Sequence, residues 1–154
     1  MKRRKISKYH EDTEAILMFL LDHGVDAVNL SKEATEQFSM AWLKTFASLV
    51  KKKHGAYVYL GYRWHAYSYR IQPCISGEEA IETYKHQPNS PFYVFNESLS
   101  YCALCNAEEH PDLTSLRRDV YVAHHKLKWT MAFTHEQPQI GPFFAQQNNS
   151  QTGY

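Results

Sequence analysis

The sequence predicts an α+β domain in which two N-terminal helices plus a short third helix pack on one face of a mostly antiparallel sheet. Three observations favour this class. Apolar residues recur at helical spacing in the first third of the chain, strand-like alternation dominates later, and helices do not alternate with the later strands as a doubly wound parallel fold requires. In a chain of 154 residues we expect one domain over 1–145 and a polar, disordered tail over 146–154.

The helices are predicted from their spacing and their end signals. Glu11–Leu21 carries its apolar residues on one side, and residues 25–30 form a short connection or a strand. Ser31 is the expected N-cap of a second helix, whose apolar residues keep helical spacing as far as Lys53. The short third helix begins at Gly77, with glutamates in its first turn.

The strands are predicted from aromatic and β-branched residues bounded by turn signals. Residues 56–70, AYVYLGYRWHAYSYR, form an aromatic, strand-like segment. A compact strand at 92–95 returns along 99–105 after an Asn-Glu-Ser turn. Residues 120–122 and 129–134 form two more strands, joined through HHKLK.

The tyrosines of the aromatic segment raise the question of a partner. Strand alternation places several of them on one sheet face, where they either pack beneath the helices or form an open aromatic platform. Such platforms stack RNA bases, and protein interfaces are also rich in tyrosine. The formal net charge of +1 favours a protein partner over nucleic acid, which is held by many phosphate contacts. The tyrosines concerned are Tyr57, Tyr59, Tyr62, Tyr67 and Tyr69.

Composition also narrows the setting. The basic run Lys2–Lys5 is read as a solvated end, and no apolar region follows it as a signal peptide requires. No apolar run approaches the ~18 residues of a membrane span. Three cysteines are an odd number, so a reduced cytoplasmic protein is the simplest expectation. The chain contains no P-loop, GxSxG or GxGxxG motif, and we predict no cofactor.

The cysteines are expected to be free thiols. Cys102 and Cys105 form a CxxC, but residues three apart in a strand lie on opposite faces, which is poor geometry for one zinc ion. No second CxxC is present, so a metal site would need histidines from elsewhere. We therefore expect both thiols to be buried, and Cys74 to pack in the core.

A second group of polar residues lies in the predicted HHKLK turn. His124 and His125 stand beside Lys126 and Lys128, and side chains of such a turn are expected to be exposed. Two interpretations stay open: a solvated basic turn, or a contact patch sensitive to pH.

The stretch WTMAFTHE ends in a polar triplet. In a strand, His135 shares the apolar face of Trp129 and lies at its rim, whereas Glu136 points the other way. The two side chains then diverge, which disfavours a shared metal. In the structural interpretation, His135 donates to a backbone carbonyl and Glu136 accepts from loop amides. In the functional one, His135 is a general base or an anchor in a cleft.

Six motifs together resemble a family of small bacterial proteins of unknown function. They are WHAYSYR (64–70), CISGEEA (74–80), FYVF (92–95), DVYV (119–122), WTMAFTHE (129–136) and GPFF (141–144), and the likeness covers residues 56–145. The resemblance implies a compact fold and a bacterial cytosolic setting, and it brings no activity. Small bacterial proteins of this composition are often immunity proteins encoded beside toxin genes. This comparison is a general analogy and does not rest on a shared motif.

Three functional hypotheses follow. The first is a cytoplasmic protein-binding module, an immunity protein that neutralises a toxin by occlusion, with its contacts made by Asp119, Tyr121, Trp129, His135 and Glu136. The net charge of +1 argues against a basic nuclease as that toxin. The alternative is a small hydrolase or metal-assisted enzyme that uses His135 with Glu136 or Asp119. An RNA-binding sheet is a weaker third hypothesis.

Overall fold

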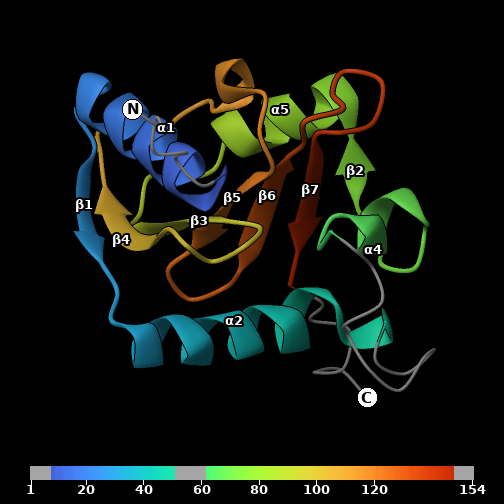
Figure 1. The fold of residues 1–154 in the computed structure, drawn as a ribbon. Coiled ribbons are helices and arrows are strands. Elements are labelled where there is room, and N and C mark those ends of the chain that lie inside the picture. The colour runs from blue at the N-terminus through green and yellow to red at the C-terminus, as the bar shows by residue number, and fades with distance from the viewer. Residues whose placement is uncertain (1–7, 51–61, 148–154) are drawn as a thin grey trace, which may run out of the picture.

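The computed structural model describes residues 8–50 and 62–147. Within them, seven strands form one sheet in the order β1-β4-β3-β5-β6-β7-β2, with helices around it (Figure 1). The helical elements are α1 (Lys8–Asp22), α2 (Lys32–Phe46), α4 (His65–Ser68), α5 (Gly77–Lys85) and the 3-10 turn η2 (Thr114–Leu116). The strands are β1 (Asp26–Asn29), β2 (Ile75–Ser76), β3 (Phe92–Asn96), β4 (Cys102–Asn106), β5 (Val120–His124), β6 (Trp129–Phe133) and β7 (Phe143–Gln146).

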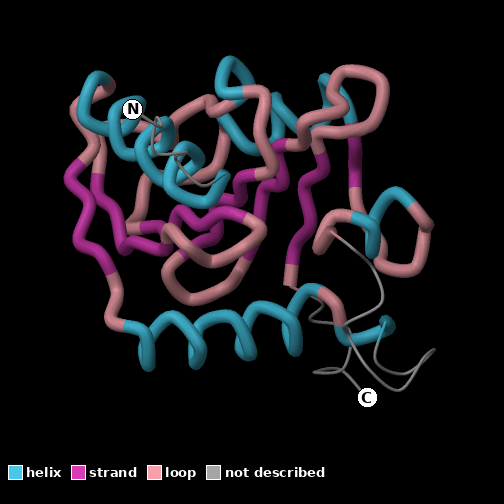
Figure 2. Tube along the Cα trace, viewed as in Figure 1, coloured by secondary structure: helices cyan, strands magenta, loops and turns pink. Residues whose placement is uncertain are grey.

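Every strand pair of this sheet is antiparallel, so the predicted α+β class with a mostly antiparallel sheet is confirmed. The predicted strands at 92–95, 120–122 and 129–134 form its centre, which Figure 2 shows in magenta. The register of β5 and β6 pairs Val120 with Phe133. The residues just before β5 and just after β6 are therefore neighbours at one end of the sheet.

Each face of the sheet has its own hydrophobic core, because β5 and β6 are buried at every position. On one face, Val122 and Trp129 pack with residues from α1 and α5. On the other, Tyr121 and Ala132 pack with residues from α2 and from the segment around α4. The prediction that three helices cover one face is therefore wrong, since α2 lies opposite α1 (Figure 1). Two-sided burial requires helices on both faces, because neither apolar face can stay in water.

The predicted N-cap of α2 is confirmed: the Ser31 hydroxyl accepts the Ala34 N–H at 3.1 Å. The helix ends earlier than predicted, at Phe46, and residues 48–50 are helical again. Within residues 48–50 the Leu49 N–H donates to the side chain of Gln72 at 3.1 Å, so a distant residue satisfies a donor left free by the break at residue 47. The predicted continuation to Lys53 lies outside the described residues.

The aromatic segment predicted as a strand folds differently where the structure describes it. Residues 62–64 form a turn that leads into α4. The Trp64 N–H donates to the Tyr121 hydroxyl at 3.0 Å, and the Tyr67 hydroxyl donates to the Phe46 carbonyl at 3.1 Å. These tertiary contacts override the β propensity of the aromatic residues. An aromatic platform on a sheet face is therefore wrong for Tyr62, Tyr67 and Tyr69, whereas Tyr57 and Tyr59 lie outside the described residues.

The cysteines are free thiols, as predicted. Cys102 and Cys105 are both buried in β4 and belong to the cores on opposite faces of the sheet. This separation prevents them from binding one metal ion together. Cys74 is half-buried and packs against the core that contains Tyr121, as predicted.

The predicted tail begins too early. Gln146 is the last residue of β7, and the Gln147 N–H donates to the Lys128 carbonyl at 2.7 Å. The remaining residues of the tail lie outside the described part of the chain. Across the described residues, no helix combines the length and the apolar character needed to cross a membrane.

Candidate functional site

Asp119 and His135 meet at the end of the β5–β6 hairpin. The Nδ1 atom of His135 lies 2.9 Å from each carboxylate oxygen of Asp119, and the backbone N–H of His135 donates to Oδ1 at 3.0 Å. The structural interpretation of His135 is therefore wrong in its partner, because the acceptor is a carboxylate and not a backbone carbonyl. Two hydrogen bonds to one charged group hold both the backbone and the ring of this histidine.

The contact also determines which ring nitrogen faces outward. A carboxylate only accepts hydrogen bonds, so Nδ1 of His135 carries a proton and Nε2 is left free for other partners. The Nε2 atom lies 3.9 Å from Oε1 of Glu136. The side chains of His135 and Glu136 are 39% and 45% exposed, against 14% for Asp119. The predicted divergence of His135 and Glu136 is wrong, because β6 ends at Phe133 and both residues lie in the following loop.

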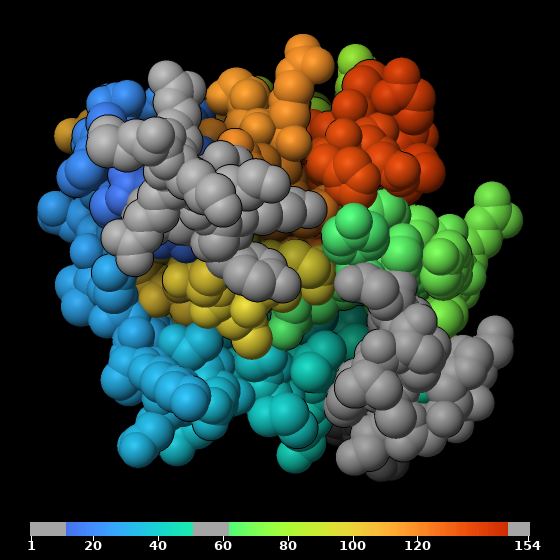
Figure 3. Space-filling view, viewed as in Figure 1, coloured from blue at the N-terminus to red at the C-terminus, as the bar shows by residue number. Residues whose placement is uncertain are grey.

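Aromatic rings surround this pair. The indole N–H of Trp64 donates to Oδ1 of Asp119 at 2.9 Å, and the Tyr62 ring stacks on Trp64 with centroids 5.3 Å apart. The Tyr62 ring also lies 5.3 Å from His135. In Figure 3 the red segment that contains the 134–142 loop lies against the green segment that begins at residue 62.

The ring cluster continues along α4, where His65 stacks on Tyr69 with centroids 4.5 Å apart. Tyr69 is 60% exposed, so the cluster reaches the surface there. We name this set the His135 patch; it consists of Tyr62, Trp64, His65, Tyr69, Asp119, His135 and Glu136.

A buried polar network lies beneath the His135 patch. Both carboxylate oxygens of Glu97 accept the Arg63 backbone N–H at 3.0 Å, and one accepts the Arg63 guanidinium at 2.9 Å. The Tyr121 hydroxyl donates to the other oxygen of Glu97 and accepts the Trp64 N–H. Burial raises the pKa of Glu97, and the Arg63 charge opposes that rise. The network ties the β3–β4 turn to the turn that carries Tyr62 and Trp64.

The loop after β6 is held by its own contacts. The Thr134 hydroxyl donates to the Ile140 carbonyl, and the Thr134 N–H donates to the side chain of Gln137 at 3.0 Å. Gly141 has a φ of +89°, and a Cβ atom there would lie 2.9 Å from Cγ2 of Thr134. Only glycine fits this position without strain. The sequence Gly-Pro after the triplet therefore serves the loop that presents His135.

The predicted partner-binding residues do not all lie on this surface. Asp119, His135 and Glu136 come together in the patch, whereas Tyr121 is fully buried and Trp129 is 3% exposed. These two residues belong to the cores on opposite faces of the sheet, so they do not form one surface with His135. Tyr121 instead supports the patch from below.

Arg63 and Glu97 were not among the predicted site residues. The sequence around Glu97, Asn-Glu-Ser, predicts only a turn, and a single acidic residue in a turn carries no local signal of its partner 34 residues away. The aromatic stretch 56–70 draws attention to Trp64 and His65, although it predicts a strand where the structure has a turn and α4.

The prediction for the HHKLK turn is wrong at its first residue. His124 is the last residue of β5 and is only 8% exposed. Burial, followed by nearby positive charges, lowers its pKa to about 4. The reason is the length of the hairpin: β5 extends two residues beyond the predicted strand, so only the residues after His124 turn.

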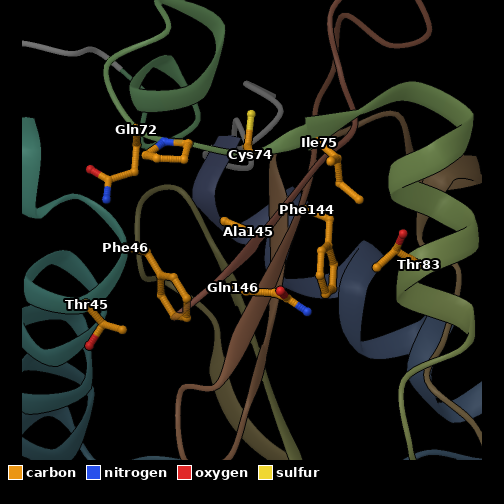
Figure 4. A pocket seen from close by; sticks show the side chains of 10 residues that line it. Thr45, Phe46, Gln72, Cys74, Ile75, Thr83, Phe144, Ala145 and Gln146 are labelled. Atoms are coloured by element: carbon orange, nitrogen blue, oxygen red, sulfur yellow. The ribbon is translucent and has the colours of Figure 1, made fainter. Parts of the chain in front are cut away.

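Hollows on the described surface lie elsewhere. One of about 440 Å³ opens at the sheet edge, where Phe46 of α2 and Thr83 of α5 stand on either side of Phe144 and Ala145 (Figure 4). It and three further hollows are lined by residues other than Asp119 and His135. Within residues 8–50 and 62–147, no three His, Cys, Asp or Glu side chains are grouped so as to hold a metal ion.

Comparison with known proteins gives a family without an assigned activity. The chain matches the family described as "Domain of unknown function (DUF4275)" over residues 15–144. No curated protein and no solved structure matches it. The match spans most of the chain, so the chain belongs to this family, and the predicted membership in a family of unknown function is confirmed at that level.

Proposed function

We propose that this member of the DUF4275 family is a protein-binding module that contacts its partner through the His135 patch. The observation that supports this most is that aromatic rings at the surface lie beside His135, whose ring is oriented by Asp119. The Tyr69 and His135 side chains reach the surface beside the ring of Tyr62, and Glu136 adds an exposed carboxylate. Protein interfaces are enriched in such aromatic anchors with polar tips.

Hydrogen bonds within the chain itself hold the patch in one geometry. Three N–H groups, one from the Trp64 indole and two from His135, converge on the Asp119 carboxylate. The network of Glu97 fixes the turn below. Binding to an ordered surface loses little conformational entropy, so fewer contacts suffice for a given affinity.

The chemistry of the patch indicates the complementary group on the partner. The free Nε2 of His135 is an acceptor in its neutral form, and the Glu136 carboxylate beside it is also an acceptor. A partner donor, above all an arginine or lysine that also lies over the Tyr62 or Tyr69 ring, satisfies both. Binding proceeds by occlusion and needs no reaction. Neutralisation of a toxin domain is the specific role that we propose for such occlusion, in a cytoplasmic bacterial setting.

The test is affinity capture from the native host lysate with wild-type chain and two histidine variants. We expect His135→Ala to lose a stoichiometric protein partner that the wild type retains, because the anchor and its contact to Asp119 disappear. His86→Ala is the matched control, since the His86 side chain is 78% exposed just after α5 and lies outside the patch. Equal capture by wild type and both variants excludes the His135 patch as the binding surface.

A second function is favoured by one observation, the contact of His135 Nδ1 with the Asp119 carboxylate. A carboxylate that orients a histidine in this way leaves Nε2 as a general base, as in hydrolases with a catalytic triad. Among the described residues, however, no serine, threonine or cysteine side chain hydrogen-bonds to His135. In this alternative His135 therefore activates a water molecule, and Glu136 or Asp119 assists. Hydrolysis of ester or amide substrates that His135→Ala abolishes and His86→Ala leaves intact would favour this reading over the binding module.

A further inference from the structure

A second feature of the surface is a hollow at the turn end of the β5–β6 hairpin, the end opposite Asp119. It encloses about 620 Å³ between the loop after α5, the start of β6 and the end of β7. None of its nine lining residues is acidic. They are Gln87, Pro88, Asn89, Ser90, His124, Lys128, Trp129, Gln146 and Gln147.

The tautomer of the neutral His124 ring makes its Nε2–H a hydrogen-bond donor at this hollow. Its Nδ1 accepts the Lys126 backbone N–H at 3.0 Å, so a neutral ring carries its proton on Nε2. The ring is neutral at pH 7, because burial and the surrounding charges lower the pKa of His124 to about 4. Within the described chain, the Nε2–H of His124 donates to no other group. The His124 side chain is mostly buried and lines the hollow, so an N–H group without a partner at this position points to a ligand that accepts.

The charge around the hollow has one sign. The groups that act electrostatically on His124 are all basic, and they include Lys126 and Lys128. Lys128 also lines the hollow itself. A positive field and an unsatisfied donor together are the usual features of an anion site.

We propose that this hollow binds an oxyanion, the phosphate or carboxylate group of a small molecule, between Lys128 and His124. Lys128 supplies the charge, while the Nε2–H of His124 supplies a directed hydrogen bond. The Trp129 ring and Pro88 offer an apolar wall to the rest of the molecule. This site is separate from the His135 patch and does not depend on the proposed protein partner.

The test is a titration of the isotope-labelled full chain, followed by NMR of the imidazole of His124 and the indole of Trp129. Sodium phosphate and sodium acetate are added in separate arms at constant ionic strength, with sodium chloride as the reference. We expect saturable shifts at both residues and a rise in the pKa of His124 when the site is filled. Saturation by phosphate alone identifies a phosphate site, by acetate alone a carboxylate site, and by both a general oxyanion site.

Two lysine variants make the test specific. Lys128→Ala should weaken binding about tenfold or more, because it removes the charged donor to the oxyanion. Lys126→Ala removes the same charge from the same hairpin without removing a lining residue, and should change affinity less than about threefold. The absence of saturable shifts in every arm, or equal weakening by both variants, overturns the proposal.

Discussion

Glu97 connects the stability of the fold to the geometry of the His135 patch, and Glu97→Ala measures that connection. The substitution removes the carboxylate that accepts from the Arg63 backbone, the Arg63 guanidinium and the Tyr121 hydroxyl. Removing one member of a buried ion pair costs about 3–5 kcal/mol, because the other charge loses its partner. The side chains of Arg63 and Glu97 are 13% and 21% exposed, so water partly screens the pair, and we expect ~3 kcal/mol.

The assay is urea unfolding followed by tryptophan fluorescence, with the free energy of unfolding extrapolated to water. A domain with a stability of about 5–15 kcal/mol stays folded after this loss, so a transition remains measurable. Glu109→Ala is the control: Glu109 is exposed, and its substitution should change stability by less than about 0.5 kcal/mol. A loss below about 1 kcal/mol for Glu97→Ala would show that the Arg63–Glu97–Tyr121 network does not hold the turn.

Three further predictions concern other parts of the fold. Thr130→Val should cost about 1–3 kcal/mol in urea unfolding, because Thr130 accepts the buried indole N–H of Trp42 at 3.0 Å; an unchanged midpoint would contradict this. Gly141→Ala should cost about 1–3 kcal/mol through its positive φ and the clash with Thr134, and a thermal midpoint equal to wild type would refute it. The contribution of His124 is complete above pH 6.5 and is lost as the pH falls toward about 4, because the unfolded chain binds the proton more readily. Acid titration of stability should therefore show a loss of up to ~3 kcal/mol across this window that is absent in His124→Gln.

The central sheet could be predicted because its signal is local. Residues 92–95, 120–122 and 129–134 combine aromatic and β-branched residues between turn signals, and each forms a strand. The burial of both sheet faces also has a local signal in the sequence. VYVAH and WTMAF have few polar positions, which indicates burial on both sides and not alternation between core and solvent.

The segment that contains Trp64 could not be predicted because its deciding contacts are distant. Its N–H meets the Tyr121 hydroxyl 57 residues away, and its indole meets Asp119 55 residues away. The β propensity of the same aromatic residues predicts a strand. The Tyr121 hydroxyl lies beside Trp64 only in the folded structure, and no local sequence pattern indicates that contact.

The pairing of Asp119 with His135 stands between these two cases. Both residues were chosen as site residues from the sequence, but their contact depends on the register that pairs Val120 with Phe133. The length of the turn between β5 and β6 sets that register, and the turn was predicted to begin one residue too early, at His124. With the correct turn, the residues that flank the two strands could have been placed side by side.

The arrangement of buried and exposed polar groups determines which variants can report on function. Glu97 and Tyr121 hold the turn beneath the patch, so their substitution changes stability and binding together. His135 and Glu136 are 39% and 45% exposed and follow the end of β6, so their substitution removes surface chemistry while both cores remain packed. A loss of partner binding in His135→Ala at unchanged stability therefore separates the surface from its support. The same loss in Tyr121→Phe would show only that the patch needs the buried hydrogen bonds of the Tyr121 hydroxyl to Glu97 and Trp64.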